Sequence, residues 1–324
     1  RESDWSSDVC SSDLQSLKQT TRKKAAAAPQ EERPPKRRSR LRELLHSLFF
    51  SGPSFLGMLI FFVIPFGVVV YYSFINGALD HGFAGLKNYV SVMQNGAFRI
   101  AVKNTAVFSA LSVPLAVILA MALALLLEAR IPWKSQFRTF FLSPMMVPIA
   151  SIILVWQVLF HDNGVVNELL KSLGHDKIYW FSSNASLVVI VVLFLWKNLG
   201  YNMILFMAAL NNVPKAMLEA AEVEGASEWT QFVHIKLRYL SPTILFVTIL
   251  SIINSFKVFR EIYLLTGNYP YDSLYMLQHF MNNMFRQLDY QKLSAAAVLL
   301  AIVIVILIAI LFAVENYFGK DVEG

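Results

Sequence analysis

The chain has 324 residues, of which 56% are hydrophobic and only 15% are charged. Soluble domains of this size carry about a quarter charged residues. The apolar residues come in blocks of about twenty, which is the length that a helix needs to cross a bilayer. Blocks this long exceed a barrel strand. The composition therefore excludes a soluble globular domain and predicts an all-α integral membrane protein, whose helices satisfy their own backbone hydrogen bonds in lipid.

The positive charge is concentrated near the N-terminal end of the sequence. The net charge is +6, and ten of the 28 Lys and Arg residues lie between Lys18 and Arg42. A basic segment directly ahead of a membrane span sets orientation and contacts anionic lipid. No base-stacking or groove-reading pattern accompanies this charge, so we predict membrane lipid and not nucleic acid as its partner.

The segment before the first apolar block falls into two parts. Residues 1–14, "RESDWSSDVCSSDL", resemble a translated sequencing adapter, and we interpret them as an assembly artefact that is left out of fold reasoning. Cys10 is the only cysteine, so the remaining chain offers no disulfide and no thiolate metal site, and we predict neither metal nor cofactor. Residues 15–53 are rich in charge, alanine and proline without an apolar period, which predicts a disordered cytoplasmic tail.

Residues 54–318 are predicted to form a six-span membrane domain. Lys and Arg near the span ends, such as Arg130 in the short second loop, place the tail, the second and fourth loops and residues 319–324 in the cytoplasm. We also predict a kink at Pro65 and a short interfacial helix over 165–173. The predicted spans are 54–75, 104–127, 139–160, 187–210, 242–263 and 293–314.

The fourth loop, 211–241, interrupts the apolar sequence with polar and small residues. Asn212 is a good helix N-cap, and strong helix-forming sequence follows it. Gly225 is predicted to end this helix at positive φ. Ser227 is predicted to cap a second helix, and Pro242 to begin the fifth span. The residues alone allow an ordinary amphipathic surface helix or a small-residue face that another protein approaches closely.

The sequence "EAAEVEGA", followed by "IKL" and Pro242, resembles the EAA motif of ABC-importer permeases. Glu224 stands where that motif usually has Asp, and Arg238 stands where its first proline is usual. The resemblance extends over about 53–318 and implies the fold of a type I ABC importer permease. "WQVLFHDNGVVNELLKSLG", "NNVPKAMLEAAEVEGA" and "SFKVFREIYLLT" are similar to the carbohydrate branch, the maltose-type permeases, whereas "LLTGNYPYDS" departs from that branch's glycine-rich outer loop.

This resemblance implies a set of partners. The fourth loop would couple to a cytoplasmic ATPase dimer, and the coupling residues it implies are Glu219, Ala220, Ala221 and Gly225. A second permease subunit and an extracytoplasmic solute-binding protein would complete the machine in a bacterial plasma (inner) membrane. The chain lacks the glycine-rich GxxxxGK[ST] phosphate-binding pattern, so we expect a transport subunit without an ATPase site of its own, and not an enzyme.

Polar residues inside the predicted spans mark either a transport pathway or packing between helices. Asn198 and Tyr201 share one face of the fourth span, and Ser251, Asn254 and Ser255 share one face of the fifth. Amides and hydroxyls of this kind suit a neutral polyol. Packing is the alternative for each of them, and snorkelling toward the lipid headgroups is the alternative for the lysines.

The resemblance gives six of these residues a more specific role. They fall at sugar-contacting positions of the maltose-type permeases, and Tyr201 and Ser251 keep the residue type of that branch. The implied substrate-pathway residues are Lys197, Asn198, Tyr201, Ser251, Asn254 and Ser255.

We therefore predict a permease subunit of a binding-protein-dependent ABC importer that carries a sugar or oligosaccharide. The same machinery for glycerol-phosphate or another solute is one alternative, and an anionic solute would give Lys197 a direct role. An ion-coupled secondary transporter is a second alternative. We count against it that no carboxylate buried within a span is evident, since Glu261 lies near the outer end of the fifth, and that no repeat of broken helices is evident. A membrane scaffold or receptor is the third alternative.

Overall fold

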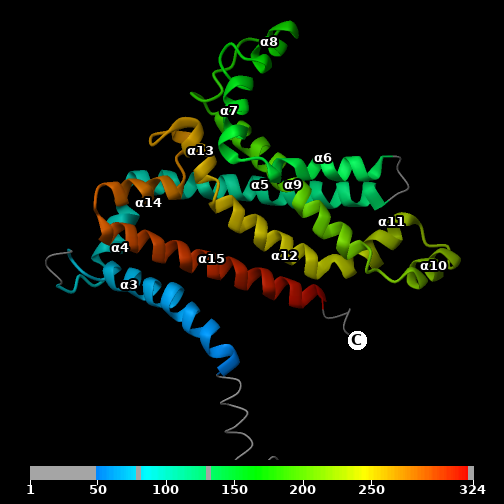
Figure 1. The fold of residues 1–324 in the computed structure, drawn as a ribbon, viewed down its shortest axis with the longest axis horizontal. Helices are drawn as coiled ribbons and strands as arrows, with labels where there is room; N and C mark the ends of the chain where they lie inside the picture. The colour runs from blue at the N-terminus through cyan, green and yellow to red at the C-terminus, as the bar shows by residue number, and fades with distance from the viewer. Residues whose placement is uncertain (1–48, 78–81, 129–132, 320–324) are drawn as a thin grey trace, which may run out of the picture. The chain divides into compact units, whose positions relative to one another are not determined.

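A computed structural model describes residues 49–77, 82–128 and 133–319 (Figure 1). The chain divides into two compact units, 1–65 and 66–324, which are described separately. The predicted artefact, residues 15–48 of the predicted tail and Arg130 lie outside the described residues, so these predictions stay open.

The described part of the first unit belongs to a 25-residue helix, Phe49–Ser73, which is long and apolar enough to cross a membrane. A π-helical turn, η1 (Leu59–Val63), precedes α3 (Ile64–Ser73). Pro65 is the second residue of α3 and has no N–H to donate to the preceding turn. The helix is therefore irregular, through this π turn, directly before Pro65, where we predict a kink.

The second unit is helical throughout, and the described residues contain no strand beyond a single bridge between Ile75 and Phe83. Among the described helices, five are long and apolar enough to cross a membrane, or six if one bent pair counts as a single span. This agrees with the predicted all-α membrane protein. The helices are α4 (Lys87–Gln94), α5 (Gly96–Glu128), α6 (Lys134–Met146), α7 (Ile149–Leu159), α8 (Val165–Ser172), α9 (Ser186–Leu210), α10 (Lys215–Val223), α11 (Glu228–Gln231), α12 (Leu237–Phe256), α13 (Phe259–Thr266), α14 (Leu277–Arg286) and α15 (Tyr290–Gly319), with a 3₁₀ turn η3 (Asp272–Leu274).

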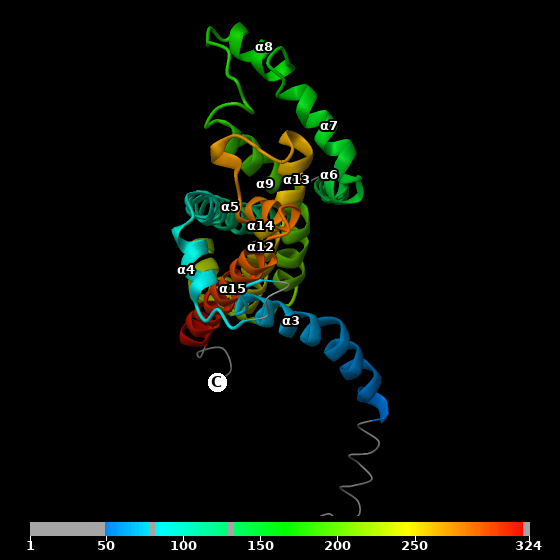
Figure 2. The same ribbon diagram turned by 90° about the vertical axis from the view of Figure 1, so that its left-hand side faces the viewer.

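Three long helices form the centre of the second unit. Helices α5, α9 and α12 pack against one another, α6 packs on α9, and α15 packs on α12 and α14 (Figures 1 and 2). Ala116, Ala120 and Ala124 recur every fourth residue on α5 and are fully buried. Small residues at this spacing let helix backbones approach closely, which is how membrane helices associate without a hydrophobic driving force between them.

The third predicted span is not one helix. It is divided into α6 and α7, whose axes differ by 100°. The break lies at Val147, which is extended (φ −87°, ψ 135°), and at Pro148, which precedes α7. A residue before proline is disfavoured in the helical conformation, which explains the break. Helix α7 leads to α8, which confirms the short helix predicted over 165–173 and projects away from the central helices in both views.

The fifth predicted span begins earlier than Pro242. The helical segment starts at Glu228 and runs through α11 and a π-helical segment, η2 (Phe232–Lys236), into α12. Pro242 lies inside α12, so its assignment as the start of the span is wrong. Its fixed φ is compatible with a helix, and its missing N–H removes a single backbone hydrogen bond. The second loop helix and the fifth span are therefore one continuous element.

Candidate functional site

A cavity of about 620 Å³, with several polar side chains in a largely apolar wall, lies between α9, α12 and α13. Helix α9 contributes one group of polar side chains, and α12 and the first turn of α13 contribute another, with Gln278 of α14 and Met145 of α6 completing the wall. The polar side chains that α9 and α12 bring to this cavity are Lys197, Asn198, Tyr201 and Asn254, of which Tyr201 also offers an aromatic ring.

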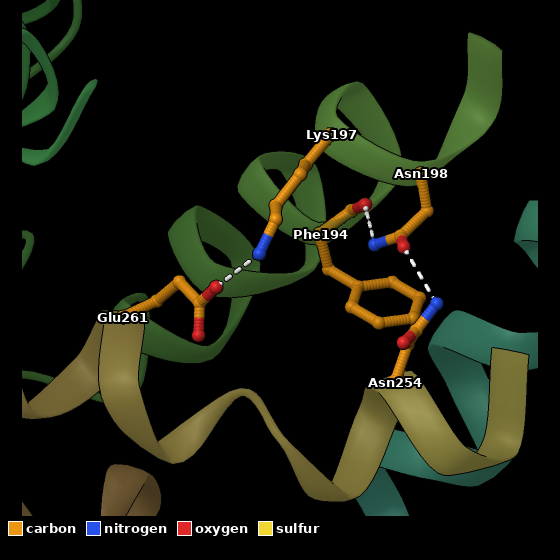
Figure 3. A network of polar contacts seen from close by, with 5 residues as sticks. All are labelled: Phe194, Lys197, Asn198, Asn254 and Glu261. Atoms are coloured by element: carbon orange, nitrogen blue, oxygen red, sulfur yellow. Dashed lines mark hydrogen bonds and ion pairs between the residues drawn. The ribbon is translucent and has the colours of Figure 1, made fainter. Parts of the chain in front are cut away.

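An ion pair crosses the cavity from α9 to α13. The ammonium group of Lys197 contacts Oε1 of Glu261, as Figure 3 shows. The Glu261 side chain is 5% exposed and the Lys197 side chain 30%. Oε2 of Glu261 is buried and has no hydrogen-bond partner among the described residues. Because burying a carboxylate is costly, the nearby ammonium is what allows Glu261 to remain in this position.

Glu261 corrects a premise of the sequence analysis. We expect no buried carboxylate within a span, yet Glu261 is buried and lies inside the helical segment Glu228–Thr266, which is long and apolar enough to cross a membrane. The sequence places it next to Arg260 and close to the polar outer loop, so local charge suggests an exposed end. Its burial depends on Lys197, which is 64 residues away in the sequence. The absence of a buried carboxylate is therefore no argument against ion-coupled transport.

A pair of amides lies beside the ion pair and also bridges α9 to α12. Nδ2 of Asn254 donates to Oδ1 of Asn198 at 3.1 Å, and Nδ2 of Asn198 donates to the carbonyl oxygen of Phe194 at 2.8 Å (Figure 3). Both amides are half-buried and line the cavity. Tyr201 is 37% exposed and lies one turn along α9 on the same wall. Amides and an accessible ring are suited to hydroxyl groups and to the face of a sugar.

Two of the six predicted pathway residues point elsewhere. Ser251 and Ser255 are buried, and neither lines the cavity. Oγ of Ser251 accepts a hydrogen bond from Nδ2 of Asn202 at 3.1 Å. Oγ of Ser255 lies 2.8 Å from Oγ of Ser109 on α5. These serines join α12 to α9 and α5, so the geometry brings four of the six predicted residues to the cavity and leaves two between helices.

The loop 211–241 contains a helix, α10, that is closed at Gly225. Gly225 has φ 81°, as predicted. The N–H of Ala226 donates to the carbonyl oxygen of Ala221, and the N–H of Gly225 donates to that of Glu222, both at 2.9 Å. This pattern is a Schellman C-cap, which requires a left-handed residue at the position of Gly225. Helix α10 has no buried residue, and Glu219, Ala220 and Gly225 are exposed while Ala221 is partly exposed.

Of the two helix N-caps predicted in this loop, one is confirmed and the other is wrong. Oγ of Ser227 accepts the N–H of Thr230 at 3.2 Å, which confirms Ser227 as an N-cap. Asn212 is not an N-cap: it lies in the turn that ends α9, and Pro214 occupies the cap position before α10. The extended backbone of Pro214 (φ −63°, ψ 121°) delays the helix until Lys215.

The loop is fastened to the central helices by a charged contact. Nζ of Lys236 in η2 lies 2.8 Å from Oε2 of Glu128 at the end of α5. The loop also carries apolar side chains that are mostly exposed: Val223 is 89% exposed and Trp229 72%. Large apolar side chains in such a position are typical of a protein contact surface.

Comparison with known proteins agrees with this architecture. The profile of a family described as "binding-protein-dependent transport system inner membrane component" matches residues 112–324. The lactose transport system permease protein of Rhizobium radiobacter is 29% identical over 246 residues, which cover 74% of this chain and 82% of that protein. The sulfoquinovosyl glycerol transport system permease protein of Agrobacterium fabrum is 30% identical, with 80% and 87% covered.

A third relative and a solved structure extend the likeness. The trehalose/maltose transport system permease protein of Thermococcus litoralis is 30% identical, and the match covers 74% of this chain and 81% of that protein. The crystal structure of a bacterial ABC transporter that imports the acidic polysaccharide alginate contains a chain with a TM-score of 0.75 to this one. The match covers 86% of this chain and 99% of that chain at 21% identity, so that likeness concerns the fold.

Proposed function

Because the chain belongs to the family of binding-protein-dependent transport system inner-membrane components, we propose that it forms part of the pathway of an ABC importer for a sugar or oligosaccharide. The fold is that of a type I ABC importer permease, and the family consists of transport subunits. Several relatives are named as permeases for lactose, trehalose/maltose and arabinooligosaccharides. The observation that carries the sugar assignment here is the cavity lined by Asn198, Asn254 and Tyr201.

We propose that Lys197, Asn198, Tyr201 and Asn254 contact the substrate and that Ser251 and Ser255 hold the surrounding helices together. The four cavity residues offer an ammonium, two amides and an aromatic ring to one space. The two serines instead bond to Asn202 and Ser109, as described above. In this account the serines hold α12 against α9 and α5 without touching substrate.

The energy for transport would come from a cytoplasmic ATPase dimer that docks on α10. Glu219, Ala220, Ala221 and Gly225 are the proposed coupling residues, and the exposed face of α10 supports this assignment. Because α11, η2 and α12 form one continuous helical element, a displacement of the loop reaches the cavity wall at Asn254 directly. A two-state movement of this element would switch the pathway between its two accessible sides.

The remaining partners are a second permease subunit and an extracytoplasmic solute-binding protein. A solved structure of similar fold is a transporter in complex with a periplasmic protein that holds an alginate pentasaccharide. Multiple spans in the bacterial inner membrane, with both termini in the cytoplasm, agree with the distribution of Lys and Arg. The chain itself would contribute no ATPase site.

Paired substitutions separate the pathway from the packing around it. Asn254→Ala combined with Tyr201→Ala removes groups of the cavity wall, and we expect substrate uptake to fall at least tenfold while ATPase association stays intact. Ser255→Ala is the matched control, because Ser255 lies one residue from Asn254 but faces α5. Unchanged affinity and rate of uptake in the double variant would refute the proposed pathway.

A further inference from the structure

The cavity between α9, α12 and α13 carries a net positive charge. Its lining contains three cations, Lys197, Lys257 and Arg260, and one carboxylate, Glu261. Glu261 already pairs with Lys197. Among the described residues, the side chains of Lys257 and Arg260 have no hydrogen-bond or ion-pair partner, and both residues are exposed. Two positive charges therefore remain available to a ligand in this space.

Local helix chemistry does not account for both of these cations. Lys257 is the C-cap of α12, where a positive charge complements the helix dipole. Arg260 lies in the first turn of α13, where the same dipole disfavours a positive charge. The bend between the two helices brings both residues to the cavity lining. The dipole of its own helix therefore does not explain the position of Arg260 in this wall.

We propose that this cavity binds a saccharide that carries a negative charge on a carboxylate or sulfonate group. This inference rests on the proposed function and narrows its substrate class. Arg260 offers a planar guanidinium that matches two oxygens of such a group, and Lys257 adds a second charge beside it. The amides of Asn198 and Asn254 then receive sugar hydroxyls. A neutral sugar would leave two cations unmatched in the cavity.

Binding of two matched disaccharides to the full chain in nanodiscs tests this inference. The probes are digalacturonate and its carboxyl-reduced counterpart, galactobiose, which differ only in the two carboxylates. At low ionic strength we expect digalacturonate to bind at least tenfold more tightly than galactobiose. Salt should diminish this advantage, because exposed charges are screened. Lys257→Gln combined with Arg260→Gln should abolish the advantage and leave galactobiose binding unchanged, which also shows that the variant is folded.

Lys87→Gln is the control, since Lys87 is an exposed cation on α4 outside the cavity. Equal binding of the two probes, or an advantage that survives the double variant, overturns the charge inference and leaves the proposed sugar pathway standing. Binding of neither probe contradicts both proposals. The two failures are thus distinguishable.

Phosphate in a lipid headgroup has related chemistry, and the bilayer composition distinguishes this source. Digalacturonate binding is compared in nanodiscs of phosphatidylcholine alone and with added phosphatidylglycerol. We expect the same affinity in both. If phosphatidylglycerol blocks the probe, and the Lys257→Gln/Arg260→Gln variant loses that competition, the two cations serve headgroups and the saccharide inference is overturned.

Discussion

Lys197 on α9 and Glu261 on α13 form an ion pair across the cavity, and the adjacent Asn198 bonds to Asn254 on α12. These two links fasten α9 to both sides of the bend between α12 and α13 (Figure 3). The three helical elements consequently move together in the proposed account, so a displacement of the loop 211–241 carries the walls of the cavity with it.

The two halves of this ion pair should respond unequally to substitution. Lys197→Met leaves the buried Glu261 carboxylate without a counter-ion, and we expect a loss of about 3 kcal/mol in stability. Glu261→Gln should cost clearly less, because the Lys197 side chain is 30% exposed and reaches water. Thermal unfolding of the purified variants, followed by tryptophan fluorescence, measures the difference.

The double variant Lys197→Met/Glu261→Gln provides the control for that prediction. It removes both charges, so most of the stability lost in Lys197→Met should return. Equal destabilisation by both single variants, with no recovery in the double variant, would show that the side chains act through packing and not through their charges.

At position 225, the backbone conformation that a residue can adopt, and not the size of its side chain, should decide which substitutions are tolerated. No atom lies within 4 Å of the place where its Cβ would stand, but its φ of 81° strains a β-branched residue. Gly225→Val should uncouple ATP hydrolysis from uptake while the spans remain folded. Gly225→Asn should retain most coupling, because Asn tolerates the left-handed region. Hydrolysis and uptake measured together in proteoliposomes decide this, and normal coupling in the valine variant would refute the turn assignment.

At Gly200, by contrast, the space available for a side chain should decide which substitutions are tolerated. A Cβ at this position would lie 1.9 Å from the carbonyl oxygen of Phe141, so α6 and α9 pack backbone against backbone there. Gly200→Ala must push these helices apart, and we expect it to lower the melting temperature by several degrees. Gly67→Ala is the matched control, since nothing lies within 4 Å of its Cβ position and alanine favours a helix. A thermally unaffected Gly200→Ala protein would contradict the close packing.

Local chemistry explains which parts of this protein were predictable from sequence. Gly225 and Ser227 act through hydrogen bonds to residues within five positions, so both caps were predicted correctly. The apolar blocks likewise predicted the membrane helices. The same local reasoning failed at Asn212, because Pro214 competes for the helix start, and at Pro148, where a helix break was read as a continuous span.

The cavity was predicted less completely because its walls depend on contacts between distant segments. Helical periodicity places Ser251, Asn254 and Ser255 on one face of α12, yet that face meets α5 and α9 as well as the cavity. Burial of Glu261 depends on Lys197 of another helix. No pattern within α12 or α13 alone carries this information.

The stability of the protein should depend on pH through His279 of α14, a helix outside the candidate membrane-spanning helices. Burial lowers the pKa of His279 to about 4 from its ordinary value of 6.5. The unfolded chain therefore takes up a proton between these values while the folded protein does not, so stability falls as the pH drops from about 6.5 to about 4. The full loss is roughly 3 kcal/mol.

Unfolding of the wild-type protein and of His279→Gln across this pH range measures the effect. The variant should lose the His279 part of the pH dependence, while an amide oxygen retains an acceptor for the N–H of Met276, which donates to Nδ1 of His279 at 3.3 Å. Identical pH profiles for the two proteins would show that His279 does not titrate in the way its burial requires.

The central claim, that this chain works as a permease driven by partner ATPases, is tested most directly by affinity purification of the tagged protein from native membranes in mild detergent. We predict recovery of an ATPase and a second permease, weakened by Gly225→Val and retained with Gly225→Asn. Recovery of the intact protein alone would contradict the account, and so would recovery of the same partners in equal amounts with the valine variant.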